Sequence, residues 1–224
     1  MIREYAKRFV LCTASLALFA LGNVFGVKAG VAGTNAWNTL SLGISGMTGI
    51  SFGTATLLIS AVIIAVDLLG KGQLGFATLL NALLISLFSD MFLALAGFVP
   101  EASGMIWGAA YTLIGQTIIS FATIFYLLPA LGAGPRDTLM IIIGRRFPAA
   151  PIGLVKFALE SAALLVGIVL GAPFGLGTVL VMALQASIFQ FACRLMRYEP
   201  RSVRHENLLE TCAKLAGRGA DRTK

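Results

Sequence analysis

Charged side chains interrupt the apolar second half of the sequence at two places. Arg136 and Asp137 stand in the segment ALGAGPRDTLM, and Lys156 and Glu160 stand in VKFALESAALL. Residues four apart share one face of a helix, so the lysine and the glutamate can pair. A charge in hydrocarbon costs about 2.5 kcal/mol or more, so such groups normally face the protein interior, pair with one another or mark a path for a polar solute. These four residues are therefore candidates for binding a polar or anionic ligand.

The residues around the Arg-Asp pair indicate the start of a helix. Gly132 and Gly134 let the chain bend, and Pro135 suits the first helical position because no hydrogen bond is needed from its nitrogen. Asp137 would then lie in the first turn, near exposed N–H groups and the positive end of the helix dipole. Two roles stay open: a helix N-terminus with Arg136 suits an anion, or Asp137 satisfies the helix end while Arg136 reaches lipid phosphate.

A further acid, Asp90 in LFSDMFLAL, also lies within an apolar run. Asp90 and Glu160 are candidates for proton or ion coupling, although Asp90 can equally bond a neighbouring serine or backbone group. A structural alternative is a neutral network of four charged side chains that only fastens the glycine-rich chain break at 132–134 to the membrane helix at 152–170. Its members would be Arg136, Asp137, Lys156 and Glu160. That structural role is compatible with ligand binding.

Membrane helices must position these side chains. The 224 residues are 58% apolar and 12% charged, with a mean hydropathy of +0.89. About 20 apolar residues span a bilayer as a helix, and the runs of sufficient length are 9–27, 53–70, 75–97, 104–129, 152–170 and 175–195. Two shorter stretches, 36–47 and 135–146, cover only about 18 Å as helices, so we expect them to be re-entrant or interfacial. The sequence predicts an all-α polytopic protein in a lipid bilayer.

The distribution of charge predicts the orientation. Of 17 Lys and Arg residues, eight lie from Arg194 onward and three lie in the first eight residues, which places both termini in the cytoplasm and leaves only Lys28 on the opposite side. The net charge of +7 therefore indicates topology, and we expect no nucleic-acid partner. Three scattered cysteines and one histidine predict no disulfide framework, metal site or cofactor.

The sequence also repeats itself after about 100 residues. GTNAWNTL lies over GAGPRDTL, FGTATLL over IGLVKFA, and GFATLL over GLGTVL, so that Trp37 and Asn38 correspond to Arg136 and Asp137. Asn38 is therefore a further ligand-binding candidate. Three spans per unit is an odd number, so the second unit must be inverted in the membrane, as in many secondary transporters.

These features divide the chain into four parts. We expect a cytoplasmic N-terminus (1–8), two membrane repeats (9–98 and 104–195) and a basic cytoplasmic tail (196–224) with a short amphipathic helix. That helix can touch anionic lipid headgroups or be simply solvated. Small-residue helix faces suit homodimerisation as well as internal packing.

The segments LGAGPRDTLM, GLVKFALE and GLGTVL resemble the second half of the YczE/YyaS/YitT group of bacterial membrane proteins, and TGISFGTATLL and LLNALLISLFSDMF resemble the first half. The resemblance covers nearly all of residues 10–195. It departs at Ala36-Trp37-Asn38, where relatives tend to carry Pro-Trp-Asp, and at Pro129, where a small flexible residue is usual. The family implies a protein of the bacterial cytoplasmic membrane, often described as a permease, with no agreed substrate.

We therefore expect a small secondary transporter or permease for a polar or anionic molecule. The alternative is a membrane scaffold or regulatory partner protein whose buried charges are structural. Sequence patterns of proteases, NTPases and metalloenzymes are absent from the sequence, so we do not expect an enzyme.

Overall fold

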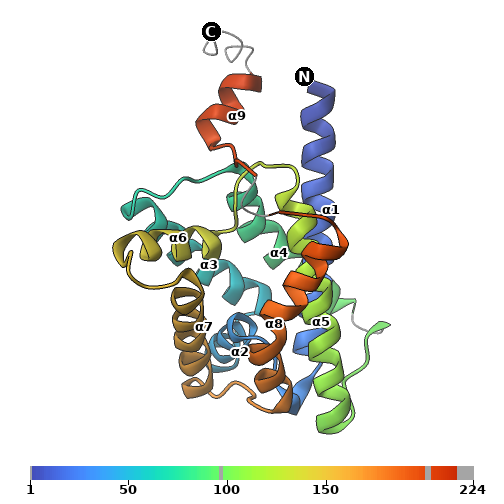
Figure 1. Cartoon of the computed structure of the whole chain (residues 1–224). Coiled ribbons are helices and arrows are strands. Elements are labelled where there is room, and N and C mark those ends of the chain that lie inside the picture. Colours follow the sequence, from blue (N-terminus) through green and yellow to red (C-terminus); the bar gives the residue numbers. More distant parts are fainter. Residues whose placement is uncertain (1, 96–97, 200–202, 216–224) are drawn as a thin grey trace.

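The chain is helical throughout the residues that the structure describes. The computed structural model describes residues 2–95, 98–199 and 203–215. In chain order the helices are α1 (Ile2–Val27), the 3-10 turn η1 (Gly30–Ala32), α2 (Ala36–Thr48), α3 (Phe52–Leu69), α4 (Phe76–Ala94), α5 (Gly104–Leu127), α6 (Pro135–Arg146), α7 (Ile152–Val169), α8 (Leu176–Leu195) and α9 (Leu208–Leu215). Figure 1 shows the N-terminus and α9 at the same end of the molecule.

Among the described residues, six helices are long and apolar enough to cross a membrane: α1, α3, α4, α5, α7 and α8. They match the predicted spans to within a few residues, except that α1 begins at Ile2 rather than near residue 9. Hydropathy marks only where the sequence becomes apolar. The helix itself extends further toward the N-terminus and includes the polar residues Tyr5 and Arg8, which bond Glu206 of the C-terminal segment. The predicted N-terminal segment 1–8 is therefore largely the first two turns of α1.

The outer surface of these helices is apolar. Large side chains are exposed on every span, among them Val10, Val62, Leu83, Trp107, Leu165 and Phe191. Exposed apolar surface of this extent is normal where lipid replaces water as the solvent. The helices are thus suited to a lipid bilayer.

The two short helices have 13 and 12 residues, too few to span hydrocarbon. α2 packs against α7 and α3, and α6 packs against α3 and α7, so each short helix lies between the same two spans. On the other side of the bundle, α1 packs against α4 and α5, and α5 packs against α8. α3 packs closely on α4, whereas α7 and α8 hardly touch.

Each short helix begins after a glycine that rests on the turn before another span. A Cβ atom added to Gly33 would collide with Thr178 Oγ1 and would lie 3.0 Å from the backbone nitrogen of Gly175. A Cβ atom added to Gly132 would lie 2.7 Å from Gly75 Cα. Both glycines also have positive φ, +73° for Gly33 and +127° for Gly132. Only glycine combines this backbone conformation with so close an approach.

The one expected topological exception, Lys28 after α1, contacts the loop between α4 and α5. The Lys28 Nζ atom lies 2.6 Å from Glu101 Oε1, and the Ala102 N–H donates to the Lys28 carbonyl at 3.0 Å. The lysine that the charge distribution places on the opposite side is therefore neutralised by the single acid of that loop.

Candidate functional site

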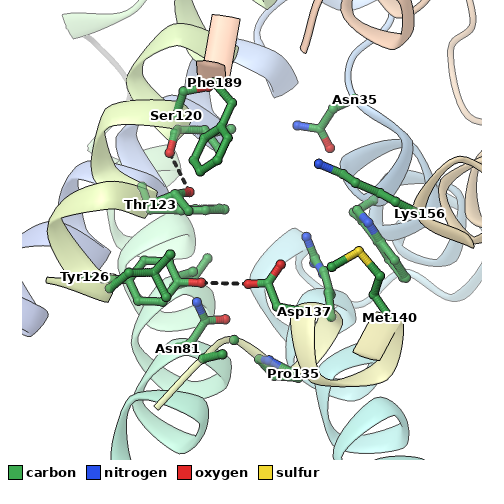
Figure 2. A pocket seen from close by; sticks show the side chains of 18 of the residues that line it. Asn35, Asn81, Ser120, Thr123, Tyr126, Pro135, Asp137, Met140, Lys156 and Phe189 are labelled. Atoms are coloured by element: carbon green, nitrogen blue, oxygen red, sulfur yellow. Dashed lines mark hydrogen bonds between the residues drawn. The ribbon is translucent and has the colours of Figure 1, made fainter. Parts of the chain in front are cut away.

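A cavity of about 580 Å³ lies where α2 and α6 begin. Its volume is within the range of small-molecule sites. Its wall combines apolar residues with amides, hydroxyls and charged groups from most of the helices. Figure 2 shows Asn35, Asp137 and Lys156 on one side of this space and Ser120, Thr123, Tyr126 and Phe189 on the other.

The cavity lies between two helix N-termini. The Asn35 side chain caps α2 by accepting from Asn38 N at 3.0 Å, and Gly134 precedes Pro135 at the first position of α6. One turn into each helix a threonine hydroxyl donates back to the cap carbonyl: Thr39 to Asn35 at 3.0 Å, and Thr138 to Gly134 at 3.2 Å. Both starts therefore direct the positive ends of their helix dipoles toward the same space.

Arg136 and Trp37 join these two helix starts. The guanidinium Cζ atom lies 4.7 Å from the centroid of the Trp37 ring, a cation–π distance. Both residues line the cavity. Within the described part of the chain, Arg136 forms no salt bridge or side-chain hydrogen bond. The cavity thus presents a cation whose charge is not matched by a contacting carboxylate.

Asp137 lies in the first turn of α6, as predicted, but its contact is with another helix. The Tyr126 hydroxyl of α5 donates to Asp137 Oδ2 at 3.0 Å (Figure 2). α6 has no side-chain cap on its N-terminal N–H groups. Asp137 therefore ties the break to α5 across the cavity.

Lys156 and Glu160 pair on one face of α7, as their spacing predicts. The distance from Lys156 Nζ to Glu160 Oε1 is 3.8 Å, and the Gln185 amide of α8 donates to Glu160 Oε2. Glu160 is buried and Lys156 is half exposed. The glutamate bridges the gap between α7 and α8, and its close partner is the amide rather than the ammonium.

Comparison with known proteins gives the family. Residues 6–194 match the family of unknown function DUF6198. The chain belongs to this family. An uncharacterized protein of Haemophilus influenzae is 35% identical over 193 residues, covering 84% of this chain and 86% of that protein. The uncharacterized membrane protein YczE of Bacillus subtilis is 26% identical over 194 residues, covering 86% and 88%. No solved structure matches the chain.

The resemblance to YczE expected from the sequence is therefore confirmed, and this DUF6198 protein is an integral membrane protein. Of the candidate ligand residues, Gly134, Arg136, Asp137, Lys156 and Glu160 line the cavity.

Three other candidates of this DUF6198 chain lie elsewhere. Gly132 packs against Gly75 behind the cavity wall. Asn38 is buried and its side chain lies against Gly26 of α1. A Cβ atom added to that glycine would be 3.1 Å from the Asn38 amide nitrogen. Asp90 accepts from Gly53 N at 2.6 Å and from Ser51 Oγ at 2.5 Å, so it caps the start of α3. This is the serine-and-backbone alternative stated for Asp90 above.

Sequence reasoning missed several polar residues of the site. Trp37, Tyr126 and Gln185 contact the charged candidates directly, and His205 of the tail also lines the cavity. The alignment of Trp37 with Arg136 in the sequence repeat held a signal, because these two residues are in contact. Tyr126 and Gln185 were detectable only as polar groups in apolar runs.

Asp67 is a buried acid outside the cavity. It is fully buried in α3, and neither carboxylate oxygen has a hydrogen-bond partner among the residues that the structure describes. Asp67 forms no ion pair with Lys71. Asp67 is therefore an acid whose burial no described contact compensates.

Proposed function

We propose that this protein is a small secondary transporter of the bacterial cytoplasmic membrane, and that the central cavity binds a small polar or anionic molecule. The observation that carries the proposal is Arg136: a guanidinium in the cavity wall that no carboxylate of the described residues contacts. A ligand carboxylate or phosphate would supply the missing bidentate partner.

The remaining charges also favour an anion. Asp137 and Glu160 accept hydrogen bonds from Tyr126 and Gln185, so both carboxylates are partly compensated. The Lys156 ammonium stands 3.8 Å from its nearest carboxylate oxygen, which leaves it free to reach a ligand. Two helix N-termini add positive potential to the same space.

The arrangement of the helices supports transport. We infer that residues 9–98 and 104–195 are inverted repeats of three spans and one re-entrant helix each. Two pairs of matched contacts and one contact between equivalent residues support a twofold relation. The pairs are Gly33 with Gly175 and Gly132 with Gly75, and the threonine bonds to Asn35 and Gly134; the single contact is Trp37 with Arg136. Discontinuous helices that meet near the midplane between inverted repeats form the substrate sites of many secondary transporters.

The orientation remains the one that the basic residues predict. Basic residues gather toward both ends of the chain, and the start of α1 and the helix α9 lie on one side of the molecule (Figure 1). By the positive-inside rule that side is the cytoplasm.

One contact favours the alternative of a non-transporting scaffold or regulatory partner protein. Gln185 holds Glu160, so this acid can serve simply to join α7 to α8. In that case the charges fasten the fold and no small molecule is needed.

Thermal unfolding of the purified protein with a panel of small anions separates these functions. An anion at about 100 times its dissociation constant stabilises the folded state by about 2.7 kcal/mol. We expect at least one of acetate, lactate, phosphate or sulfate to raise the midpoint, and R136A to abolish that shift. R145A is the matched control, because Arg145 is exposed near the end of the same helix and does not line the cavity.

Two results would contradict the transporter. The first is that no anion raises the unfolding midpoint of the parent protein. The second is that anions raise the midpoint of R136A as much as that of the parent. Unfolding of both E160Q and R136A with no change in ligand response would favour the structural alternative.

A further inference from the structure

The C-terminal segment crosses one end of the cavity. We call residues 203–215 the strap; they include α9 and the five residues before it. The Glu206 N–H donates to the Ala130 carbonyl at 2.8 Å, and the Leu208 N–H donates to the Leu74 carbonyl at 2.9 Å. The strap is thereby bonded to the connection between α5 and α6 and to the turn between α3 and α4. It lies at the end of the molecule where α1 begins (Figure 1).

Two strap residues form part of the cavity wall. Val203 and His205 both line the cavity. The His205 Nδ1 atom is buried and has no hydrogen-bond partner within the described ranges. The strap is therefore bonded to the two helix connections and also forms part of the cavity wall.

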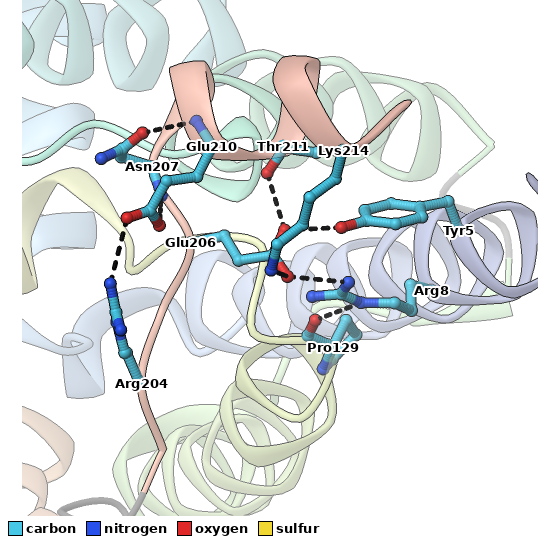
Figure 3. A network of polar contacts seen from close by, with 9 residues as sticks. All are labelled: Tyr5, Arg8, Pro129, Arg204, Glu206, Asn207, Glu210, Thr211 and Lys214. Atoms are coloured by element: carbon cyan, nitrogen blue, oxygen red, sulfur yellow. Dashed lines mark hydrogen bonds and ion pairs between the residues drawn. The ribbon is translucent and has the colours of Figure 1, made fainter. Parts of the chain in front are cut away.

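The Glu206 carboxylate joins the strap to α1 through Tyr5 and Arg8, and it also bonds Thr211 and Lys214 of the strap itself. Figure 3 shows Glu206 between α1 and α9, where four side chains reach its two oxygens. Arg8 Nη1 lies 3.1 Å from Oε1 and Lys214 Nζ lies 3.0 Å from the same atom. The Tyr5 and Thr211 hydroxyls donate to Oε2 at 2.9 and 3.0 Å.

We call Glu206 and the four side chains that reach it the Glu206 clamp. Arg8 connects this clamp to the segment between α5 and α6. Its Nε donates to the Pro129 carbonyl at 2.7 Å, one residue before the carbonyl that binds the strap backbone (Figure 3). Burial raises the pKa of Glu206, but the hydrogen bonds from Lys214, Tyr5, Thr211 and Arg8 outweigh it and hold the pKa at about 2. The clamp carboxylate is thus charged at neutral pH, when its attraction to the two cations is strongest.

We propose that the strap is a gate that closes this end of the cavity, and that a solute passes there only when the Glu206 clamp opens. The polar bonds that hold the strap lie at one edge of the protein, and Val203 also packs against the hydrophobic core cluster. The strap therefore leaves only when the Glu206 contacts and this apolar contact are both released. The gate presupposes that the cavity is the ligand site of the proposed function, but its effect on access is measurable without any transported ligand.

Access to the cavity is measured with a reporter cysteine. In a background with Cys12, Cys193 and Cys212 replaced, S120C places a thiol in the cavity wall. The rate of its reaction with a charged methanethiosulfonate reagent in detergent reports how often the cavity opens. We expect E206Q to raise this rate about tenfold or more, because it removes the charge that pairs the strap with Arg8 of α1.

E210Q is the matched control. Glu210 also lies in the strap, where it pairs with Arg204 and caps α9 together with Asn207. Glutamine keeps that cap, and the residue does not contact α1. We expect the labelling rate of E210Q to equal that of the parent.

A crosslink tests the gate without removing the clamp. The backbones of Leu74 and Leu208 are joined by a hydrogen bond of 2.9 Å, so we choose L74C and L208C for a disulfide whose formation is checked before labelling. We expect labelling of S120C to be suppressed in the oxidised form and restored by reduction. Equal rates before and after reduction would overturn the gate, even if E206Q failed to fold.

The outcomes also separate the gate from the proposed function. Unchanged labelling in E206Q and in the crosslinked protein, with anion stabilisation intact, would reject the gate alone. Clamp-dependent labelling without any anion response would keep the gate and reject the anion site.

Discussion

The guanidinium of Arg136 stacks on the ring of Trp37, with 4.7 Å between Cζ and the ring centroid, and this contact joins the starts of α6 and α2. The two residues are equivalent in the sequence repeat. If the two halves are inverted repeats, as proposed above, this contact lies near the axis that relates them. The charged member of this pair is also the cation that we propose binds a ligand.

We predict that W37L destabilises the protein and weakens anion binding. A cation–π contact contributes about 0.5–2 kcal/mol, depending on desolvation, so the unfolding midpoint in buffer should fall modestly. The anion-dependent rise should shrink because Arg136 loses its orientation. W107L, on the exposed surface of α5, is the control and should leave the anion response unchanged. An unaltered response in W37L would show that the stacking does not position Arg136.

We predict that G33A and G132A each destabilise the protein by about 2 kcal/mol or more, because a side chain at either position combines a strained backbone with a collision. Urea or thermal unfolding measures the loss. G46A is the control: it lies in α2 with open space around it, so alanine should be neutral or stabilising. Tolerance of both substitutions would contradict the close packing of the breaks.

We predict that acid weakens the Glu206 clamp. A folded pKa of about 2 lies below the ordinary value, so Glu206 stabilises the fold above its unfolded pKa of about 4.3 and loses this contribution as the pH falls toward 2. Thermal unfolding between about pH 6 and about pH 3 should therefore show a larger loss for the wild type than for E206Q. Parallel pH profiles of the two proteins would exclude this role of the carboxylate.

We predict that D67N raises the unfolding midpoint. Both oxygens of this fully buried carboxylate are without a described partner, and burying an uncompensated polar or charged group costs about 1–3 kcal/mol or more. Asparagine removes the charge at nearly constant volume. S86A, a buried hydroxyl that bonds only its own helix, is a control for altered packing. A marked destabilisation by D67N would indicate that Asp67 has a partner of its own.

Topology is tested with cysteines at Ser103 and Arg146, which are both exposed, the first before α5 and the second at the end of α6. In the six-span arrangement, S103C should react with an impermeant maleimide from outside intact cells. R146C should react only after the cells are opened. Labelling of both from one side would reject this arrangement.

The spans and breaks could be predicted because hydrocarbon imposes a length on apolar runs and because glycine and proline mark chain breaks. Arg136, Lys156 and Glu160 could be assigned to the interior because charge is costly in lipid. The position of Asn38 outside the cavity could not be predicted, and the sequence could not decide between the two roles stated for Asp90, since both depend on the rotation of a helix about its axis. For Asp90 the decisive contact is with the start of α3, a separate helix.

The tail could be predicted only in part. Its short helix follows from the spacing of its apolar residues, and α9 confirms it. A solvated or lipid-bound tail was expected, but Glu206 and Thr211 are bonded to each other and, through Glu206, to α1. Nothing local in the sequence indicates that one acid has two basic partners near opposite ends of the chain.

The crossed glycine contacts also bear on how the protein is made. Gly33 rests on Gly175 and Thr178, which the ribosome produces long after the first break has entered the membrane. The first break must therefore wait, incompletely packed, until the last span is inserted, whereas Gly132 finds Gly75 already in place. Truncation before α8 should leave the earlier helices inserted but unable to assemble, which exposes the nascent protein to membrane proteases.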